Sequence, residues 1–390
     1  MELYHTIDIL VGLTFLLVQA RISQLLARAA ARRYTRGRLA LAWCGIVAFD
    51  LLLIAGYILS FGAPTASLHL PRVGATVLTA VALFYLLLAS AVLILHRALQ
   101  FLRRRFEART DPARRRLLTA AGNTALAAPF AVLGYGSFIE RLNLHTREID
   151  IPIPGLPRDL EGLRIVQVSD IHLSPFLSEK QLAGVIDAAN ELRPHVAVMT
   201  GDLITAYGDP IDAALRQVAR LKSDAGTLAC IGNHEIYAGV ADYSERQGAR
   251  LGIRFLRDEA KALRFGAATL NFAGQDYQPK SLKPNYLEGA ERLIRPGAVN
   301  ILLQHNPDVF PTAARQGYNL LLAGHTHGGQ VTVEILHRPI SPAFFFTPFV
   351  YGLYRIGAQS AYVTRGIGTI GIPTRIGAPP ELALIRLRKA

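Results

Sequence analysis

The stretch Leu320-Leu321-Leu322-Ala323-Gly324-His325-Thr326-His327-Gly328-Gly329-Gln330 indicates most about the fold of this chain. Its apolar first part has the length of a short buried strand, and two histidines follow where that strand would end. Glycines flank the pair, so the backbone can turn sharply and approach another group closely. Neutral imidazole is the commonest protein ligand for transition metals. Histidines also occur as hydrogen-bonded loop residues, so one pair is weak evidence for a metal site.

Four segments upstream share this pattern of an apolar run followed by side chains that can bind a metal. The apolar runs, each of which predicts a buried strand, cover residues 163–169, 195–200, 227–231 and 299–304. The polar residues that follow them are Asp170 and His172, then Asp202, then Asn233 with His234 and Glu235, and finally His305. Runs of this length, rich in β-branched residues, are typical of strands buried on both faces.

Helical patterns separate these strands. Residues 178–192 open with a capping-box spacing, and their apolar positions fall on one helical face. The pair Asp209-Pro210 predicts a cap and a first-turn proline before a helix over 211–222, and Asn306-Pro307 predicts the same start for the next segment. Alternating strands and helices predict an α/β domain whose site lies beyond the carboxyl ends of the strands.

Folding would therefore bring the polar ends of all five segments to one edge of a sheet. The pooled ligands are two carboxylates, one amide and four imidazoles: Asp170, His172, Asp202, Asn233, His305, His325 and His327. One ion needs fewer ligands, and a carboxylate can bridge two cations, so the set predicts a dinuclear site. Mixed nitrogen and oxygen ligands without thiolate favour manganese, iron or zinc over calcium or copper(I).

The chemistry of such a pair of ions follows from general principles. Two cations roughly 3.5–4 Å apart can clamp the attacking and leaving oxygens of a displacement at phosphorus. A water that bridges them has a pKa near neutrality, against ~15.7 for bulk water, and so becomes a hydroxide nucleophile. An alkoxide leaving group needs a proton, which a positioned imidazole can supply.

The order Asp-x-His, Gly-Asp, Gly-Asn-His-Glu, His and Gly-His-x-His resembles the calcineurin-like metallophosphoesterase superfamily. The histidine-pair motif Gly-His-Thr-His-Gly-Gly-Gln and the tail over 362–368 are similar to its YkuE-like branch. The resemblance covers about Asp150 to the C-terminus and implies a β-sandwich flanked by helices. It also implies a hydrolase of a phosphate ester, diester or pyrophosphate that uses two divalent or trivalent metal ions (Mn, Fe or Zn).

Carried over residue by residue, the family pattern implies two half-sites that share one carboxylate. The first half-site would use Asp170, His172, Asp202 and His327. The second would use Asp202, Asn233, His305 and His325. The family pattern implies that His234 does not bind metal. This histidine would instead contact the phosphate and protonate the leaving oxygen. We take His195 as structural and expect Glu235 to orient its loop.

The basic charge of the chain lies in its N-terminal part. The formal net charge of +13 and the pI of about 10.0 could suit nucleic acid. However, fourteen arginines and only two acidic residues lie in two clusters, over 21–38 and 97–116, between apolar segments. Because these clusters account for nearly all of the net charge, we expect a membrane rather than a nucleic-acid partner.

The apolar segments predict an all-α transmembrane region of about four helices. Segments 39–61 and 73–95 are long enough to span ~30 Å of hydrocarbon. Segments 3–20 and 117–139 are weaker candidates. Asp50 is a carboxylate within the second of the four segments; it is either functional or paired with a hydroxyl of a neighbouring helix.

The predicted organisation is a transmembrane region, then a linker, then a catalytic domain, over 1–140, 141–157 and 158–390. The linker is rich in Ile-Pro and Leu-Pro, so it is an extended connection or an edge strand. The positive-inside rule puts both arginine clusters in the cytoplasm. If 117–139 crosses, the chain is a multi-pass inner-membrane protein with an extracytoplasmic catalytic domain; if that segment stays at the interface, the domain is cytoplasmic.

An aromatic run over 343–354 bears on the substrate. It could lie on the membrane, line an acyl pocket or pack in the core. A phosphorylated small molecule or a lipid-linked phosphate is the expected substrate, and membrane lipid an expected partner. Relatives in the superfamily include hydrolases of UDP-2,3-diacylglucosamine, so a pyrophosphohydrolase of that type is one alternative. The other is a membrane sensor that binds phosphorylated ligands without turnover.

Overall fold

The computed structural model describes residues 2–33, 35–60, 72–106, 116, 128–335 and 338–390. The chain forms two compact units, residues 1–135 and 136–390, which are described separately. The first contains three long helices that contact one another: α1 (Glu2–Arg33), α2 (Arg36–Ser60) and α3 (Arg72–Phe106). These helices include the predicted segments 3–20 and 73–95 and all but the last residue of 39–61. Residues 117–127 of the predicted segment 117–139 lie outside the described residues, and most of its second part forms α5 (Ala128–Phe138).

Within the described helices, the stretch Arg38–Ala55 of α2 is long and apolar enough to cross a membrane, with a mean hydropathy of 2.0. A shorter apolar stretch covers Leu88–Leu102. Asp50 pairs with a neighbouring helix, because the Ser23 hydroxyl of α1 donates to its Oδ1 at 2.8 Å. The structural alternative for this carboxylate is therefore confirmed, while a four-helix transmembrane region stays a prediction.

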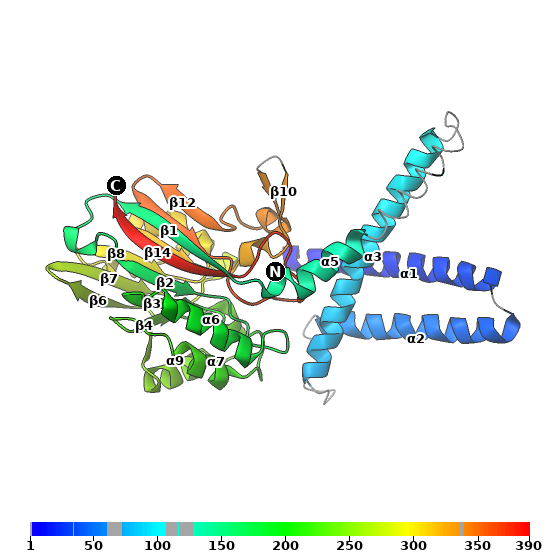
Figure 1. The fold of residues 1–390 in the computed structure, drawn as a ribbon, viewed down its shortest axis with the longest axis horizontal. Coiled ribbons are helices and arrows are strands. Elements are labelled where there is room, and N and C mark those ends of the chain that lie inside the picture. The colour runs from blue at the N-terminus through cyan, green and yellow to red at the C-terminus, as the bar shows by residue number, and fades with distance from the viewer. Residues whose placement is uncertain (1, 34, 61–71, 107–115, 117–127, 336–337) are drawn as a thin grey trace. The chain divides into compact units, whose positions relative to one another are not determined.

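Two six-stranded sheets form the framework of the second unit (Figure 1). The first sheet has the order β1 (His145–Ile153), β14 (Glu381–Lys389), β2 (Arg164–Val168), β3 (Val196–Thr200), β4 (Thr227–Cys230), β5 (Ile253–Phe255). The second has the order β12 (Gly352–Ile356), β13 (Gln359–Val363), β9 (Leu320–Ala323), β8 (Val299–Leu303), β7 (Ala268–Gly274), β6 (Glu259–Phe265). All five predicted strands are present, as β2, β3, β4, β8 and β9, and each lies inside its sheet rather than at an edge.

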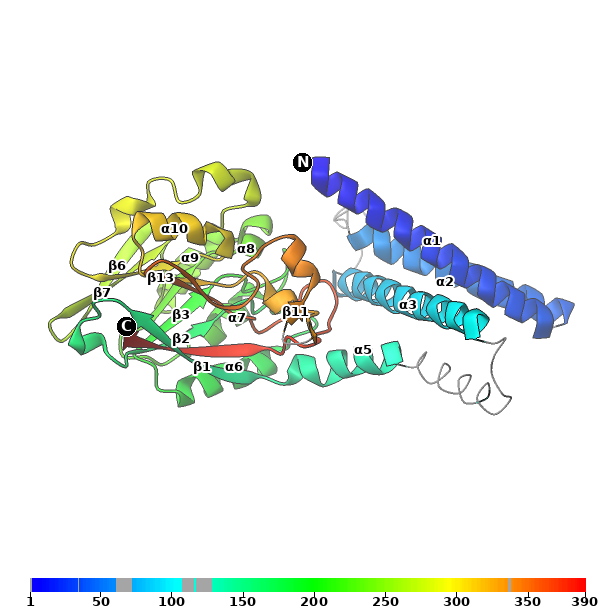
Figure 2. The same cartoon turned by 90° about the horizontal axis from the view of Figure 1, so that it is seen from above.

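The sheets pack face to face and helices cover both outer faces. Alternate residues of the strands, such as Val198 and Ile301, meet in an apolar core between the sheets. The other face of the first sheet is covered by α6 (Glu179–Glu191), α7 (Ile211–Val218) and α9 (Ala241–Arg250), and α10 (Phe310–Gln316) covers the second sheet (Figure 2). The predicted α/β sandwich flanked by helices is thus confirmed for this unit.

Short elements complete the second unit. A small hairpin consists of β10 (Val333–Ile335) and β11 (Arg338–Ile340). The 3-10 helices away from the ligand loops are η2 (Glu140–Leu142), η3 (Arg158–Leu160), η4 (Lys280–Asn285) and η5 (Ala290–Leu293), and α5 (Ala128–Phe138) spans the boundary between the units. Within the predicted linker, the chain forms β1, an edge strand that pairs in parallel with β14 from His145↔Glu381 onward.

The predicted helix starts differ in their outcome. Ser178 and Gln181 form the expected capping box at the start of α6. The cap predicted at Asp209 is wrong: its carboxylate accepts from the Thr205 and Ala206 amides at 3.0 and 2.9 Å, while Pro210 occupies the cap position. Short acidic side chains bond local loop amides in competition with helix caps. α7 also ends at Val218, before the predicted residue 222.

Asn306 caps as predicted, because its side chain accepts from the Asp308 amide at 2.9 Å. The segment that it starts is nevertheless a 3-10 turn, η6 (Pro307–Val309), which leads into α10.

Candidate metal centre

The carboxyl ends of five central strands deliver all seven predicted ligands to one edge of the sandwich. The side chains form three groups, and within each group the possible ligand atoms lie within 4.8 Å of one another. The groups are Asp170 with His172 and His327, His172 with Asp202 and His234, and Asp202 with His305 and His325. The first and third groups belong to the two predicted half-sites. His234, for which no metal was predicted, lies beside the shared carboxylate. Metal binding itself stays a prediction.

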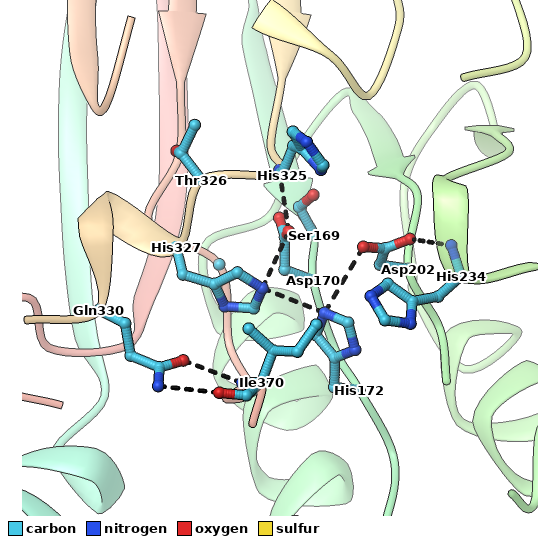
Figure 3. Close-up of polar contacts among 12 residues, drawn as sticks. Ser169, Asp170, His172, Asp202, His234, His325, Thr326, His327, Gln330 and Ile370 are labelled. Carbon is cyan, nitrogen blue, oxygen red and sulfur yellow. Dashed lines mark hydrogen bonds and ion pairs between the residues drawn. The ribbon is translucent and has the colours of Figure 1, made fainter. Parts of the chain in front are cut away.

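Asp202 occupies the position between the half-sites. Its Oδ2 atom lies 3.5 Å from Nε2 of His172 on one side and 2.9 Å from Nε2 of His305 on the other. Nε2 of His327 lies 3.1 Å from Nε2 of His172 and 3.5 Å from Oδ1 of Asp170, so these three side chains converge on one point (Figure 3). One carboxylate oxygen therefore faces both sets of imidazoles, as a bridging ligand must.

Several of the converging atoms are buried and have no hydrogen-bond partner. Oδ2 of Asp170, Oδ1 of Asn233 and Nε2 of His305 are in this state. The close approach of His305 to Asp202 lies outside hydrogen-bond geometry, so it does not satisfy that nitrogen. Buried polar atoms without partners are costly and rare in native proteins. Oxygen and nitrogen atoms converging in this way fit divalent transition-metal ions.

The protonation of the imidazoles suits the same role. Burial lowers the pKa of His172 and that of His325 to about 3, and it lowers the pKa of His327 well below its usual value. These rings are therefore neutral at physiological pH, the form that binds metal. Burial also acts to lower the pKa of His305, but the Asp202 and Asp170 carboxylates outweigh it and raise this pKa to about 10. The two carboxylates thus favour positive charge at this point.

The backbone at the ligands is strained. Of the nine non-glycine residues with positive φ in the described part of the chain, five are predicted ligands: Asp170, His172, Asp202, His325 and His327. Such conformations cost roughly 1–3 kcal/mol each and cluster at functional sites. Hydrogen bonds between the loops hold them, including those from the Asp170 amide to the Gly201 carbonyl (3.0 Å) and from the His325 amide to Oδ1 of Asp170 (2.8 Å).

Glycine is required where ligand loops touch. A Cβ atom at Gly324 would overlap Oδ2 of Asp170 and the hydroxyl of Ser169, and one at Gly232 would overlap Oδ1 of Asp202. The close approach expected for the glycine before the histidine pair is therefore confirmed, and the group approached is another ligand.

His234 stands at the side of the cluster and is partly exposed. Its amide donates to Oδ1 of Asp202 at 3.0 Å, and its ring lies edge-on to that of His172 with 4.7 Å between centroids. Nδ1 lies 2.5 Å from the Thr205 carbonyl, which can only accept, so Nδ1 carries a proton. This bond fixes the ring and leaves Nε2 free to exchange a proton.

Glu235 orients its loop, as expected, and also the neighbouring one. Its buried carboxylate accepts from the amides of Asp202, Leu203 and Gly232 at 3.0, 2.6 and 2.9 Å. His195 is structural as predicted, because its Nδ1 accepts from the Arg164 amide at 2.9 Å.

Arg375 is a residue of this centre that the sequence analysis missed. Its fully buried guanidinium donates to the carbonyls of Ala378, Arg365 and Gly368 at 2.8, 2.9 and 3.1 Å. One of its nitrogens also lies 3.4 Å from Nδ1 of His327. The arginine thus braces the loop that follows β13 against a ligand loop. No local sequence signal marks this role, because its partners come together only in the fold.

Comparison with known proteins agrees with the site. The calcineurin-like phosphoesterase family model matches residues 163–329. The uncharacterized metallophosphoesterase YkuE of Bacillus subtilis (strain 168) is 32% identical over 266 residues, which cover 65% of this chain and 89% of YkuE. A Danio rerio transmembrane protein with metallophosphoesterase domain is 34% identical over 256 residues, 62% of this chain and 57% of that protein. The match thus spans little more than half of the Danio relative's length.

Among solved structures, TT1561 of Thermus thermophilus aligns with a TM-score of 0.36 at 11% identity, covering 53% of this chain and 90% of that one. The match with YkuE extends over most of that relative, and the ordered motifs of the family converge at one site. The chain belongs to the calcineurin-like metallophosphoesterase family.

Proposed function

We propose that this protein is a membrane-anchored, two-metal hydrolase of phosphate esters, diesters or pyrophosphates. One observation carries the proposal: Oδ2 of Asp202 faces His172 of one half-site and His305 of the other. A single carboxylate in this position can be shared by two ions, which distinguishes a dinuclear centre from two separate sites.

The ligand sets follow from the two groups. Asp170, His172, Asp202 and His327 would hold one ion, and Asp202 with Asn233, His305 and His325 would hold the other. Two ions bound there would activate water and neutralise charge on the phosphoryl oxygens. The chain itself contributes the fixed positions of the ligands, since Glu235 and Arg375 hold the loops that carry them.

His234 is the proposed acid. The Thr205 carbonyl keeps Nδ1 protonated and turns Nε2 away from that loop. A protonated Nε2 can pass its proton to the leaving oxygen of the substrate, a role that contributes roughly 10²–10⁴-fold in rate. The ring is partly exposed, so it can regain a proton from solvent after each turnover.

We further propose that the chain is a multi-pass inner-membrane protein with an extracytoplasmic catalytic unit, acting on a lipid-linked phosphate. The apolar stretch Arg38–Ala55 and the two arginine clusters support the membrane location. Exposed phenylalanines near the ligand loops, at positions 344–346, support an apolar substrate portion. A C-terminal alkaline phosphatase fusion tests the topology; an inactive fusion alongside an active cytoplasmic reporter would contradict it.

The activity is tested with the full chain, purified in detergent, stripped of metal and reloaded with Mn²⁺. We expect metal-dependent hydrolysis of bis-p-nitrophenyl phosphate or p-nitrophenyl phosphate, and nearly complete loss of it in Asp202→Asn. Asp187→Asn is the control, because this exposed carboxylate pairs with Arg220 at the surface. Wild-type rates in Asp202→Asn, or hydrolysis without metal, would overturn the proposal.

A further inference from the structure

A segment beside the ligand loops carries exposed apolar side chains. It leaves the histidine-pair loop at residue 331, forms the β10–β11 hairpin and η8 (Pro342–Phe345), and returns at Val350; we refer to its described residues, 331–335 and 338–350, as the apolar excursion. Its exposed large side chains, with their exposed fractions, are Val333 (49%), Ile340 (57%), Phe344 (40%), Phe345 (91%) and Phe346 (52%). Val333 and Ile340 are cross-strand partners in the hairpin. Figure 1 shows the hairpin projecting from the sandwich.

The base of the apolar excursion is fixed to the metal centre. The Thr332 hydroxyl donates to the Gly328 carbonyl at 2.7 Å, and the Thr326 hydroxyl donates to the Val350 carbonyl at 2.5 Å. Gly328 and Thr326 flank His327, one of the predicted ligands. Both ends of the apolar excursion are therefore bonded to residues adjacent in sequence to a predicted ligand, which places its binding partner beside the proposed reaction site.

We infer that the apolar excursion inserts into the interfacial region of a lipid bilayer, with Phe345 as the deepest side chain. The inference rests on the membrane location in the proposed function. Soluble proteins rarely expose contiguous apolar patches unless the patch binds something. Tryptophan and tyrosine are enriched at the membrane–water interface, and phenylalanine occurs on the buried apolar face of segments that lie in that interface.

The charge beside the exposed phenylalanines is positive, which favours a membrane surface that contains anionic lipid. The Lys280 ammonium donates to the Phe346 carbonyl and lies 5.7 Å from the centroid of the Phe346 ring. Lys283, in the same 3-10 turn, is exposed. Lysines beside an apolar wedge can reach anionic lipid headgroups while the wedge occupies the acyl region.

The size of the patch also favours a bilayer over a protein partner. Specific protein interfaces contain roughly 20–30 residues on each side, whereas the side chains that the structure describes in the apolar excursion include five large exposed apolar ones. A few aromatic residues suffice for membrane insertion when another part of the chain is already anchored, and Arg38–Ala55 is long enough to provide that anchor.

Tryptophan fluorescence of the full chain tests the inference independently of catalysis. The chain has one tryptophan, Trp43, which Trp43→Phe removes. In that background, Phe345→Trp is the probe, Phe346→Trp a second probe, and Leu251→Trp an exposed control after α9. The protein is reconstituted into vesicles of phosphatidylcholine and phosphatidylglycerol, with and without bromine on the phosphatidylcholine acyl chains.

We expect brominated lipid to quench Phe345→Trp by at least twofold relative to unbrominated vesicles and to leave Leu251→Trp unchanged. Because bromine is present in both leaflets, the orientation of the protein in the vesicle does not affect the result. Emission from Phe345→Trp and Phe346→Trp that brominated lipid leaves unchanged would overturn the inference. If those probes are also shielded from aqueous iodide, a protein surface covers them instead. Since the readout needs no turnover, a failure of the proposed hydrolysis would leave this test intact.

Discussion

Glu235→Gln separates the geometry of the metal centre from its ligands. The substitution keeps the size of the side chain and removes no predicted ligand. In the wild type, Oε2 accepts from the Asp202 and Gly232 amides and Oε1 accepts from the Leu203 amide. A glutamine has one acceptor oxygen, so its NH₂ group must face at least one of these N–H donors. The loops that carry Asp202 and Asn233 would then separate.

The expected magnitude follows from these bonds. A hydrogen bond to a charged group contributes roughly 1.5–3 kcal/mol, and at least one of the three is lost. Burial raises the pKa of Glu235, and the nearby negative charge of Asp202 raises it further. Both effects make the charged carboxylate costly, so a neutral amide at this position recovers part of the lost stability. We expect a loss of about 1–3 kcal/mol in the free energy of unfolding. Displacement of the residues that orient ligands weakens metal binding by about 10–100-fold.

Competition with a chelator measures the metal affinity, and thermal unfolding of the metal-free protein gives the direction of the stability change. Glu191→Gln, at the exposed end of α6, is the matched control and should behave as the wild type. Wild-type metal affinity in Glu235→Gln would refute the view that this carboxylate holds the two loops together.

Three further predictions concern the same centre. His234→Asn should retain metal but lose about 10²–10⁴-fold in rate on esters with poor leaving groups, and less on p-nitrophenyl esters; equal losses on both would count against an acid role. Burial tends to lower the pKa of His305, but Asp202 and Asp170 raise it from 6.5 to about 10, so the ring keeps its proton until the pH rises through that value. Metal must therefore displace a proton between pH 7 and 9, and calorimetry in buffers of different ionisation enthalpy should detect its release; identical heats in all buffers would exclude it. Gly324→Ala should abolish stable metal binding because its Cβ overlaps Asp170, whereas Gly184→Ala in α6, with open space around it, should not; metal content measured on both variants decides the point.

Local patterns predicted the strands and the convergence of the ligands well. Runs such as 196–199 and 320–323 are apolar on both faces, and such runs become buried strands in either sheet. The polar residues that follow these strands must lie at one edge of the sheet, because the carboxyl ends of parallel strands lie at the same edge.

Features that depend on tertiary contacts could not be predicted. Asp209 is a residue type that often caps helices, but its carboxylate instead accepts a hydrogen bond from the Thr205 amide in the preceding loop. Positive φ at Asp170 has no sequence signal, because the strain is stabilised by amides of distant loops. Arg375 is 48 positions from His327 and resembles an ordinary basic residue in the C-terminal tail. Residues 117–127 lie outside the described residues, so the membrane crossing of segment 117–139 stays a prediction.

The central claim is that Asp202 is shared by two metal ions. Electron paramagnetic resonance of the full chain loaded with Mn²⁺ tests it directly, because a bridging carboxylate couples the spins of the two ions. We predict an exchange-coupled spectrum at two ions per chain, which Asp202→Asn converts into the signal of isolated Mn²⁺. A wild-type protein that shows only isolated Mn²⁺ at saturation would contradict the shared position of Asp202 between His172 and His305.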